Sequence, residues 1–255
     1  MGRPVSGPVV VLQSLKGHQN RLGLLRADGF VLRIRDFAES DLIVTLFTEQ
    51  WGKRTAIAKR ARRLNSRLGG VFDLLNRVEV VFYPKSRLDL VSQGALLQGF
   101  PHLKGDLNVV AAALLVGRLL DRLLPFQQPE ERVYSLFGRF LDLLEAGNDS
   151  VDRLRLSVTL KLLAFLGHRP RLTSCVRCGS ESGPFLFASE CGGVLCRACT
   201  RREEGIKISR GLALSLDAFL QLPLERVNVI HLCPEDIRVA VKVVDGYVDH
   251  LASGP

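Results

Sequence analysis

Four cysteines form two pairs whose spacing suits a metal ion. Two residues separate Cys175 from Cys178, two separate Cys196 from Cys199, and 17 residues lie between the pairs. Two thiolates at this spacing can bind one cation, and paired knuckles at this distance are typical of a zinc ribbon. Four thiolates leave no coordination position for water or substrate. We therefore expect one structural Zn²⁺ per chain rather than a catalytic metal.

A fifth cysteine in this segment leaves an alternative open. Cys191 lies five residues before Cys196 and could replace one of the four ligands. Because Gly192 and Gly193 directly after it are typical of a hairpin turn, we interpret Cys191 as a bystander. The remaining hypothesis is that these cysteines are free thiols that bind no metal. Clustered cysteines that suit a metal better than disulfides predict a reducing, cytoplasmic location.

The second group of residues that could carry a function is a run of cations. Seven Lys or Arg and no acid occur between Lys53 and Arg67. Cations of this kind neutralise nucleic-acid phosphates, while nearby aromatic rings stack on bases. The predicted DNA-binding residues are Lys53, Arg54, Lys59, Arg60, Arg62, Arg63 and Arg67. A solvated charged loop is the alternative, and the nearby aromatics Phe47, Trp51, Phe72 and Phe82 could equally belong to the core.

The overall charge supports an acidic partner for the N-terminal part. The chain of 255 residues carries a net charge of +9, and its first hundred residues contain 16 Lys or Arg against 8 Asp or Glu. This asymmetry indicates a polyanion such as nucleic acid, or an anionic membrane surface. The longest uncharged apolar stretch, 107–117, is too short to span a membrane, so we expect no membrane insertion. The phosphate-loop, zinc-protease and hydrolase motifs are absent from the sequence, which gives those enzyme classes no support.

Short apolar runs between turn residues predict five strands in the first hundred residues. These runs are Phe30–Arg35, Leu42–Thr48, Lys53–Ala58, about Phe72–Tyr83 and Leu88–Ala95. Five strands with no long helix between them favour a small closed barrel of the OB-fold type. We assign residues 1–24 to an N-terminal extension and residues 25–100 to the barrel.

Beyond Pro101 the apolar period becomes helical. The expected helices are Asp106–Leu124, Pro129–Gly147, a helix from Asp149 or Ser150 to Gly167, one from Ser209 to Leu222, and one from Pro234 to about Leu251. The cysteine module, 171–205, interrupts this helical domain, which comprises 101–170 and 206–255. The predicted fold class is α+β: an N-terminal OB-fold β-barrel followed by an all-α domain that a four-cysteine zinc ribbon interrupts.

Several motifs in this order resemble a known family. The barrel carries Glu39-x-Asp41-x-Ile43-Val44-x-Leu46-Phe47-Thr48, Gly52-Lys53, Ala58-Lys59-x-Ala61-Arg62-Arg63 and Ser66-x-Leu68-x-Gly70, and the helical part carries C-x-x-C-G and G-G-x-L-C-x-x-C. From about Gly29 to about Leu251 the chain resembles the bacterial recombination-mediator family RecO. Arg60 departs from the family's usual glycine, and Cys191 is additional to the usual four cysteines.

The resemblance implies a non-enzymatic DNA repair and recombination mediator. Such a protein binds single- and double-stranded DNA, anneals complementary strands and contacts the acidic tail of single-strand-binding protein. With its partner RecR it helps to load the recombinase on gaps in the RecF pathway, in the bacterial cytoplasm at the nucleoid. From the residues alone, an RNA-binding or ribosome-associated protein with an OB barrel and a zinc ribbon is the alternative. A ligase-like nucleotidyltransferase has little support, since K-x-D-G is absent.

Overall fold

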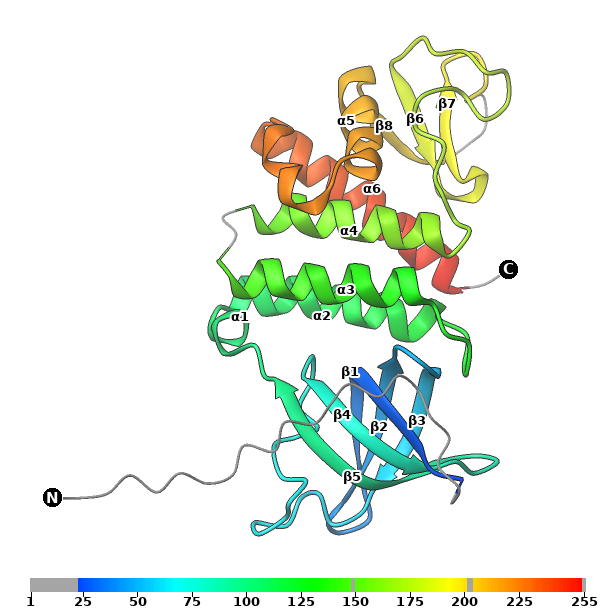
Figure 1. Ribbon diagram of the computed structural model, residues 1–255. Coiled ribbons are helices and arrows are strands. Elements are labelled where there is room, and N and C mark those ends of the chain that lie inside the picture. The colour runs from blue at the N-terminus through cyan, green and yellow to red at the C-terminus, as the bar shows by residue number, and fades with distance from the viewer. Residues whose placement is uncertain (1–22, 148–149, 201–203, 254–255) are drawn as a thin grey trace, which may run out of the picture.

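The computed structural model describes residues 23–147, 150–200 and 204–253, so most of the predicted extension 1–24 and the candidate cap Asp149 lie outside the described residues. A β-barrel lies at one end, layers of helices follow, and a small sheet with the cysteines lies at the other end (Figure 1). The predicted α+β fold class is confirmed.

Five strands close the barrel. They are β1 (Leu25–Phe37), β2 (Asp41–Thr48), β3 (Gly52–Ala58), β4 (Arg77–Tyr83) and β5 (Asp89–Gln98), in the order β1-β2-β3-β5-β4. Only β3 and β5 pair in parallel, over two residue pairs, and the other neighbours are antiparallel. Buried aliphatic side chains and Phe82 fill the interior. This is the OB-like barrel that the sequence predicts.

Two strands begin about five residues away from their predicted starts. Strand β4 begins at Arg77 rather than near Phe72, because residues 72–76 form turns whose apolar side chains, such as Leu75, are buried. Strand β1 begins at Leu25, five residues before the predicted start at Phe30. In this early part Leu25 and Ala27 are buried, and both residues pair with β4. The alternation of a half-buried strand therefore begins before Phe30, the predicted start.

Six α-helices follow the barrel in the described part of the chain. They are α1 (Pro101–Gly105), α2 (Leu107–Leu123), α3 (Glu131–Glu145), α4 (Val151–Phe165), α5 (Arg210–Gln221) and α6 (Pro234–Ser253), with 3-10 turns at Ser189–Cys191 and Leu224–Val229. The sequence did not predict α1, which is only five residues long. The side chain of Asp106 caps α2 by accepting hydrogen bonds from the amides of Asn108 and Val109.

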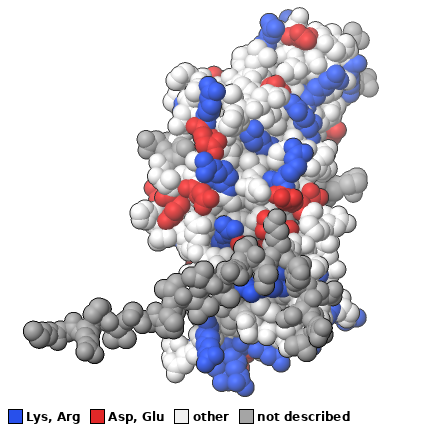
Figure 2. Space-filling model, in the orientation of Figure 1, with Lys and Arg blue, Asp and Glu red and all other residues white. Residues whose placement is uncertain are grey.

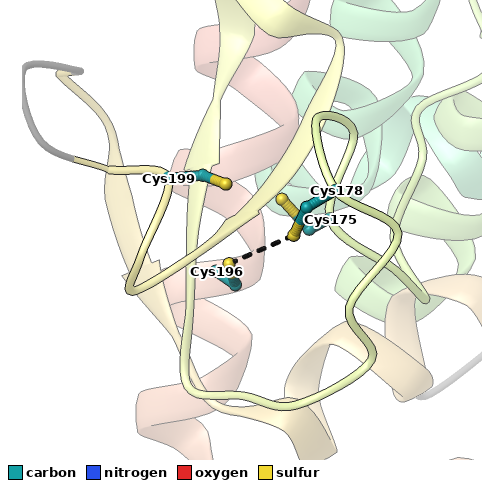
Figure 3. A group of neighbouring side chains, drawn as sticks. All are labelled: Cys175, Cys178, Cys196 and Cys199. Atoms are coloured by element: carbon teal, nitrogen blue, oxygen red, sulfur yellow. Dashed lines mark hydrogen bonds between the residues drawn. The ribbon is translucent and has the colours of Figure 1, made fainter.

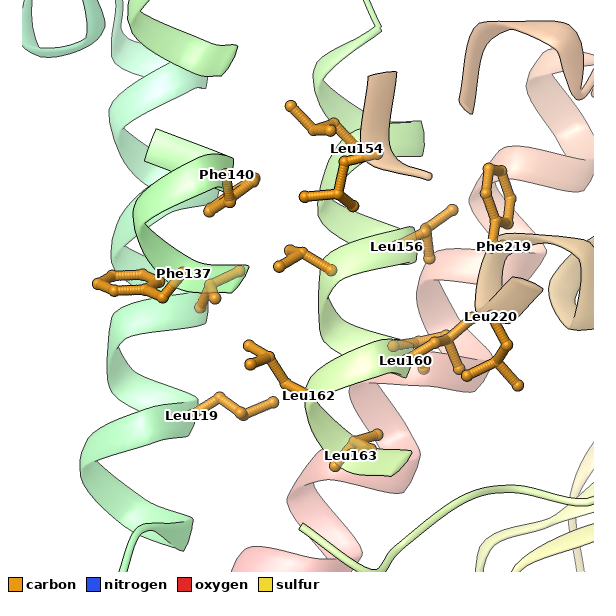
Figure 4. Close-up of a cluster of buried hydrophobic side chains, with 14 of the residues drawn as sticks. Leu119, Phe137, Phe140, Leu154, Leu156, Leu160, Leu162, Leu163, Phe219 and Leu220 are labelled. Atoms are coloured by element: carbon orange, nitrogen blue, oxygen red, sulfur yellow. The ribbon is translucent and has the colours of Figure 1, made fainter. Parts of the chain in front are cut away.

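Helix α4 lies at the centre of the helical part. All residues from Leu154 to Leu160 are buried, so this helix packs on every side rather than along one stripe. Figure 4 shows its leucines between Phe137 and Phe140 of α3 on one side and Phe219 of α5 on the other. Helix α4 therefore packs between the helices that contact the barrel and the helices beside the cysteine module.

One face of the barrel packs into the hydrophobic core of the helices, apart from the barrel's own interior. The ring of Phe30 on β1 lies 5.0 Å from that of Tyr134 and 5.2 Å from that of Phe137, both on α3. Beside these rings, Asp28 accepts hydrogen bonds from Arg77 at 2.8 Å and from the Tyr134 hydroxyl at 2.6 Å. Burial and the Asp28 hydrogen bond raise the pKa of Tyr134. The barrel is thus fixed rigidly to α3.

The small sheet has the order β7-β6-β8, with β6 (Phe185–Ala188), β7 (Gly193–Cys196) and β8 (Ile206–Ile208). It packs on α6, where the rings of Phe187 and Tyr247 lie 5.6 Å apart. Within the ranges that the structure describes, no helix combines the length and apolarity needed to cross a bilayer.

Candidate metal centre and nucleic-acid interface

The four predicted metal ligands converge at one point. Cys175 and Cys178 lie in the loop before β6, Cys196 ends β7, and Cys199 lies in the following turn (Figure 3). Their Sγ atoms all lie within 4.8 Å of one another, and those of Cys178 and Cys196 are 3.5 Å apart. Zn–S bonds of about 2.3 Å in a tetrahedron require sulfur separations of about 3.8 Å. The donor set therefore fits a single tetrahedral ion.

Backbone hydrogen bonds shape the two knuckles. The amide of Gly179 donates to the carbonyl of Cys175 at 2.9 Å, and the amide of Cys199 donates to that of Cys196 at 2.9 Å. Gly179 has a φ of 75°, a left-handed conformation that glycine adopts at little cost. Both turns follow from the C-x-x-C spacing, so the sequence was sufficient to predict them.

The thiols also influence each other's ionisation. Burial disfavours the thiolate of Cys175, but hydrogen bonds from the amides of Cys196, Cys178 and Arg177 outweigh it and lower the pKa of Cys175 to about 6. Hydrogen bonds to Cys178 and Cys196 raise the pKa of Cys199 to about 12. Four sulfurs this close cannot all ionise without a cation, whereas a bound divalent ion would neutralise them.

Cys191 does not belong to this group. It ends the 3-10 turn after β6, and Gly192 follows it in a left-handed turn with φ 65°. A side chain on the next residue, Gly193, would place its Cβ 2.4 Å from the carbonyl oxygen of Arg171. The glycine pair is therefore needed for the turn, and the four-cysteine group is complete without Cys191.

The structure removes two of the predicted DNA-binding residues from the surface. Lys53 is 4% exposed, and its Nζ donates to the carbonyl oxygen of Asp121 at 2.6 Å. Burial lowers the pKa of Lys53. Arg54 is 8% exposed and forms two hydrogen bonds with Asp89, at 2.8 and 2.9 Å. Each of these two predicted DNA-binding cations therefore has a partner in the interior, unlike an exposed cation that is open to a phosphate.

The other five predicted cations lie together on one exposed segment. We call residues 59–67 the basic loop, and its cations Lys59, Arg60, Arg62, Arg63 and Arg67 are all exposed. The loop follows β3 at the end of the barrel away from the helices, where Figure 2 shows Lys and Arg side chains gathered. The amide of Arg60 donates to Asp41 Oδ1 at 2.8 Å, and the amide of Arg62 donates to the carbonyl of Ser40 at 2.9 Å. The β1–β2 turn thus holds the loop in place.

Most of the charge on the basic loop has no acidic partner in the described part of the chain. Arg62 forms an ion pair with Asp36 at 3.1 Å, and both side chains are largely exposed. Among the residues that the structure describes, the other four cations have no carboxylate within ion-pair distance. An exposed ion pair is worth little, so Arg62 can exchange Asp36 for a phosphate at low cost.

Arg60 has a backbone conformation that favours glycine. Its φ is 56°, in the left-handed region. The turn therefore keeps the geometry that a glycine would adopt, at a cost in strain, and presents an additional cation there.

The aromatic residues near the run turned out to be structural. Phe47, Phe72 and Phe82 are buried, and the indole N–H of Trp51 donates to the carbonyl of Arg26 at 3.1 Å. The sequence prediction missed Phe126, which is 55% exposed and lies in the connection between α2 and α3. Nothing in the local sequence pattern distinguishes it, since its position beside β3 depends on contacts distant in the sequence.

The fold and the cysteine geometry together define a class of protein: an OB-like barrel joined to a helical domain with a four-cysteine metal-binding module. The sequence comparisons identify the family. The family described as Recombination protein O N terminal matches residues 22–100, and that described as Recombination protein O C terminal matches residues 104–255. The chain belongs to the recombination protein O (RecO) family, which confirms the resemblance.

Curated relatives agree over most of the chain. A protein of Symbiobacterium thermophilum named DNA repair protein RecO is 34% identical over 232 residues, which cover 89% of this chain and 92% of the relative. A protein of the same name from Exiguobacterium sibiricum is 30% identical over 226 residues, which cover 88% and 90%. Because the matches extend through both parts, the chain is similar to these relatives in the barrel and in the helical domain.

Proposed function

We propose that this protein is a non-enzymatic DNA repair and recombination mediator that binds single- and double-stranded DNA through the basic loop. The observation that carries the proposal is the set of five exposed cations, four of them without an acidic partner among the described residues. Membership of the RecO family, whose curated relatives are named DNA repair proteins, supports the same role.

Strand annealing requires only that such a surface neutralise the phosphate charges of two strands. Two strands repel each other through their phosphates, and Lys or Arg side chains that displace counterions reduce this repulsion. The basic loop supplies those cations at the free end of the barrel, while its backbone is held by Asp41 and Ser40. No proton transfer or nucleophile is required, which is consistent with a mediator rather than an enzyme.

The cysteine module has a structural role in this proposal. The four thiolates would hold one Zn²⁺, and the ion would lock the two knuckles together. The sheet that carries Cys196 packs on α6. Metal binding therefore stabilises the end of the molecule opposite the basic loop.

The remaining surface is available for protein partners. Residues 171–255 contain ten Lys or Arg and ten Asp or Glu, so their net charge is zero. Following the family, we propose RecR and the acidic tail of single-strand-binding protein as partners, and recombinase loading on gaps of the RecF pathway as the outcome. This work would take place in the bacterial cytoplasm at the nucleoid.

The salt dependence of DNA binding tests the proposal. The variant Arg62→Ala/Arg63→Ala removes two loop cations, and Arg238→Ala/Lys242→Ala removes two exposed cations of α6 as a matched control. We expect weaker binding of single strands and duplex for the loop variant. Its slope of log affinity against log salt should decrease by about 0.9 per lost phosphate contact on duplex and about 0.7 on single strands.

The control variant should bind as the wild type does. If both variants show the wild-type slope, the basic loop is not the DNA interface. Competition between single-stranded DNA and RNA of equal length separates this proposal from the RNA-binding alternative. A preference for RNA of about tenfold or more, which corresponds to about 1.4 kcal/mol, would favour the alternative.

A further inference from the structure

Apart from the basic loop, a cationic cleft lies beside β3, on the side nearer the helices. It has a volume of about 310 Å³ and is lined by residues of β3, of the β4–β5 loop, and of the α2–α3 connection. Its lining combines the exposed Lys85, Arg87 and Phe126 with the buried Lys53 and Arg54. An exposed ring beside exposed cations is the combination that binds unpaired nucleotides.

The aromatic wall of this cleft is held in a fixed position. The amide of Gln127 donates to the carbonyl of Lys53 at 3.0 Å, so the α2–α3 connection runs along the edge of β3. This close approach requires Gly52, whose Cβ in any other residue would lie 2.1 Å from the carbonyl oxygen of Gln128. The Lys53 ammonium lies 4.4 Å from the centroid of the Phe126 ring, and 55% of Phe126 remains exposed. The ring is therefore positioned but accessible.

The cationic wall is fixed as well. Asp89 is buried, and it accepts hydrogen bonds from Arg54 and from the amide of Lys85 at 3.0 Å. This carboxylate therefore links β3 to the β4–β5 loop and neutralises Arg54. Within the described ranges, neither the Lys85 ammonium nor the Arg87 guanidinium has an acidic partner. Two exposed cations without an acidic partner in the described ranges thus line the same cleft as the ring.

We propose that this cleft is a single-strand-specific subsite, in which an unpaired base of DNA stacks on Phe126 while Lys85 and Arg87 bind the adjoining phosphates. The inference rests on the proposed function. Lys53 and the basic loop lie at opposite ends of β3, a path of about 16 Å at roughly 3.3 Å per residue. One strand that follows β3 would reach both. Bases in a duplex are already stacked and paired, so the subsite distinguishes single strands from duplex.

Replacement of the ring by an aliphatic side chain tests the subsite. Phe126→Leu keeps apolar bulk over Lys53 and removes the aromatic face. Phe165→Leu is the matched control, because Phe165 is also exposed and lies 4.2 Å from a cation, Arg132, in the helical part. Binding of the full-length proteins to fluorescent oligothymidine of about 16 nucleotides, the upper site size of an OB fold, is compared with binding to duplex.

We expect Phe126→Leu to weaken oligothymidine binding about fivefold or more and to change duplex binding by less than about twofold. Phe165→Leu should match the wild type on both. Equal losses on single strand and duplex, or no loss on the single strand, would overturn the subsite. Weaker duplex binding by the Arg62→Ala/Arg63→Ala variant supports the proposed function independently of the subsite. A wild-type protein that binds neither DNA refutes both proposals.

Photocrosslinking of the wild-type chain supplies a measurement that does not depend on a variant's folding. Oligothymidine in which one base is iodouracil is irradiated with the protein, and the attached peptide is sequenced. Attachment at Phe126 supports the subsite. Attachment only at positions distant from the cleft contradicts it.

Discussion

Replacing Arg60 by glycine should have opposite effects on stability and on DNA binding. Arg60 has a φ of 56°, and its amide donates to Asp41 Oδ1 at 2.8 Å. Because this hydrogen bond comes from the backbone, Arg60→Gly and Arg60→Ala both retain it. Both variants lose the same guanidinium, but only glycine removes the left-handed strain.

The size of the stability difference follows from that conformation. A residue with a side chain pays roughly 1–2 kcal/mol in the left-handed region, and the greater freedom of glycine in the unfolded chain cancels roughly 0.5–1 kcal/mol of this gain. The difference of these ranges is about 0–1.5 kcal/mol, and we expect Arg60→Gly to be more stable than Arg60→Ala by about 0.5–1 kcal/mol, the middle of that range. For a protein of this size, that difference raises Tm by about 1–4 °C.

Thermal unfolding and DNA titration together provide the assay. Each variant should lose about one phosphate contact, so the salt slope on duplex decreases by about 0.9 in both. An Arg60→Gly protein that melts at or below the temperature of Arg60→Ala would refute the strain argument. If the two variants differ in DNA affinity, then the backbone of the loop, and not only its charge, contributes to binding.

Three further predictions concern the metal centre and the core. Cys196→Ser should purify with less than one zinc per chain by elemental analysis, while Cys191→Ser retains it; equal zinc contents would argue against the four-cysteine site. Asp28→Asn should lower the free energy of unfolding by about 1–3 kcal/mol, because the carboxylate accepts hydrogen bonds from Arg77 and Tyr134, and denaturant titration with no change in midpoint would be inconsistent with this. Phe137→Ala should cost about 3–5 kcal/mol in the same measurement, since the ring is fully buried, and a loss below 1 kcal/mol would show that the core repacks there.

The sequence predicted the features that depend on local spacing. The cysteine pairs indicated a four-ligand site because a C-x-x-C turn places both sulfurs on one side, whatever surrounds it. The apolar runs indicated a five-stranded barrel because alternation along a strand reports burial on one face. These signals need no knowledge of distant residues.

The sequence could not show which cations of the basic run are exposed. Lys53 and Arg54 belong to the same run as Arg63, yet they are buried. Their partners, Asp121 and Asp89, lie 68 and 35 residues further along the chain. A charge count cannot distinguish a paired interior cation from a free surface one, because the difference arises only when distant segments pack together.

The same reasoning explains why Phe126 was missed. It lies between two helices, in a segment without periodicity, and its position depends on the close approach of Gln128 to Gly52. A positive φ was one reason for glycine there, and the packing of the α2–α3 connection against β3 was a second reason that the sequence did not reveal.

Strand annealing tests the central claim most directly. Complementary oligonucleotides coated with single-strand-binding protein are mixed without ATP, and duplex formation is followed with and without this protein. The account predicts that the wild type accelerates annealing and that Arg62→Ala/Arg63→Ala does so less. A folded wild-type protein that leaves the rate at its spontaneous value would contradict it.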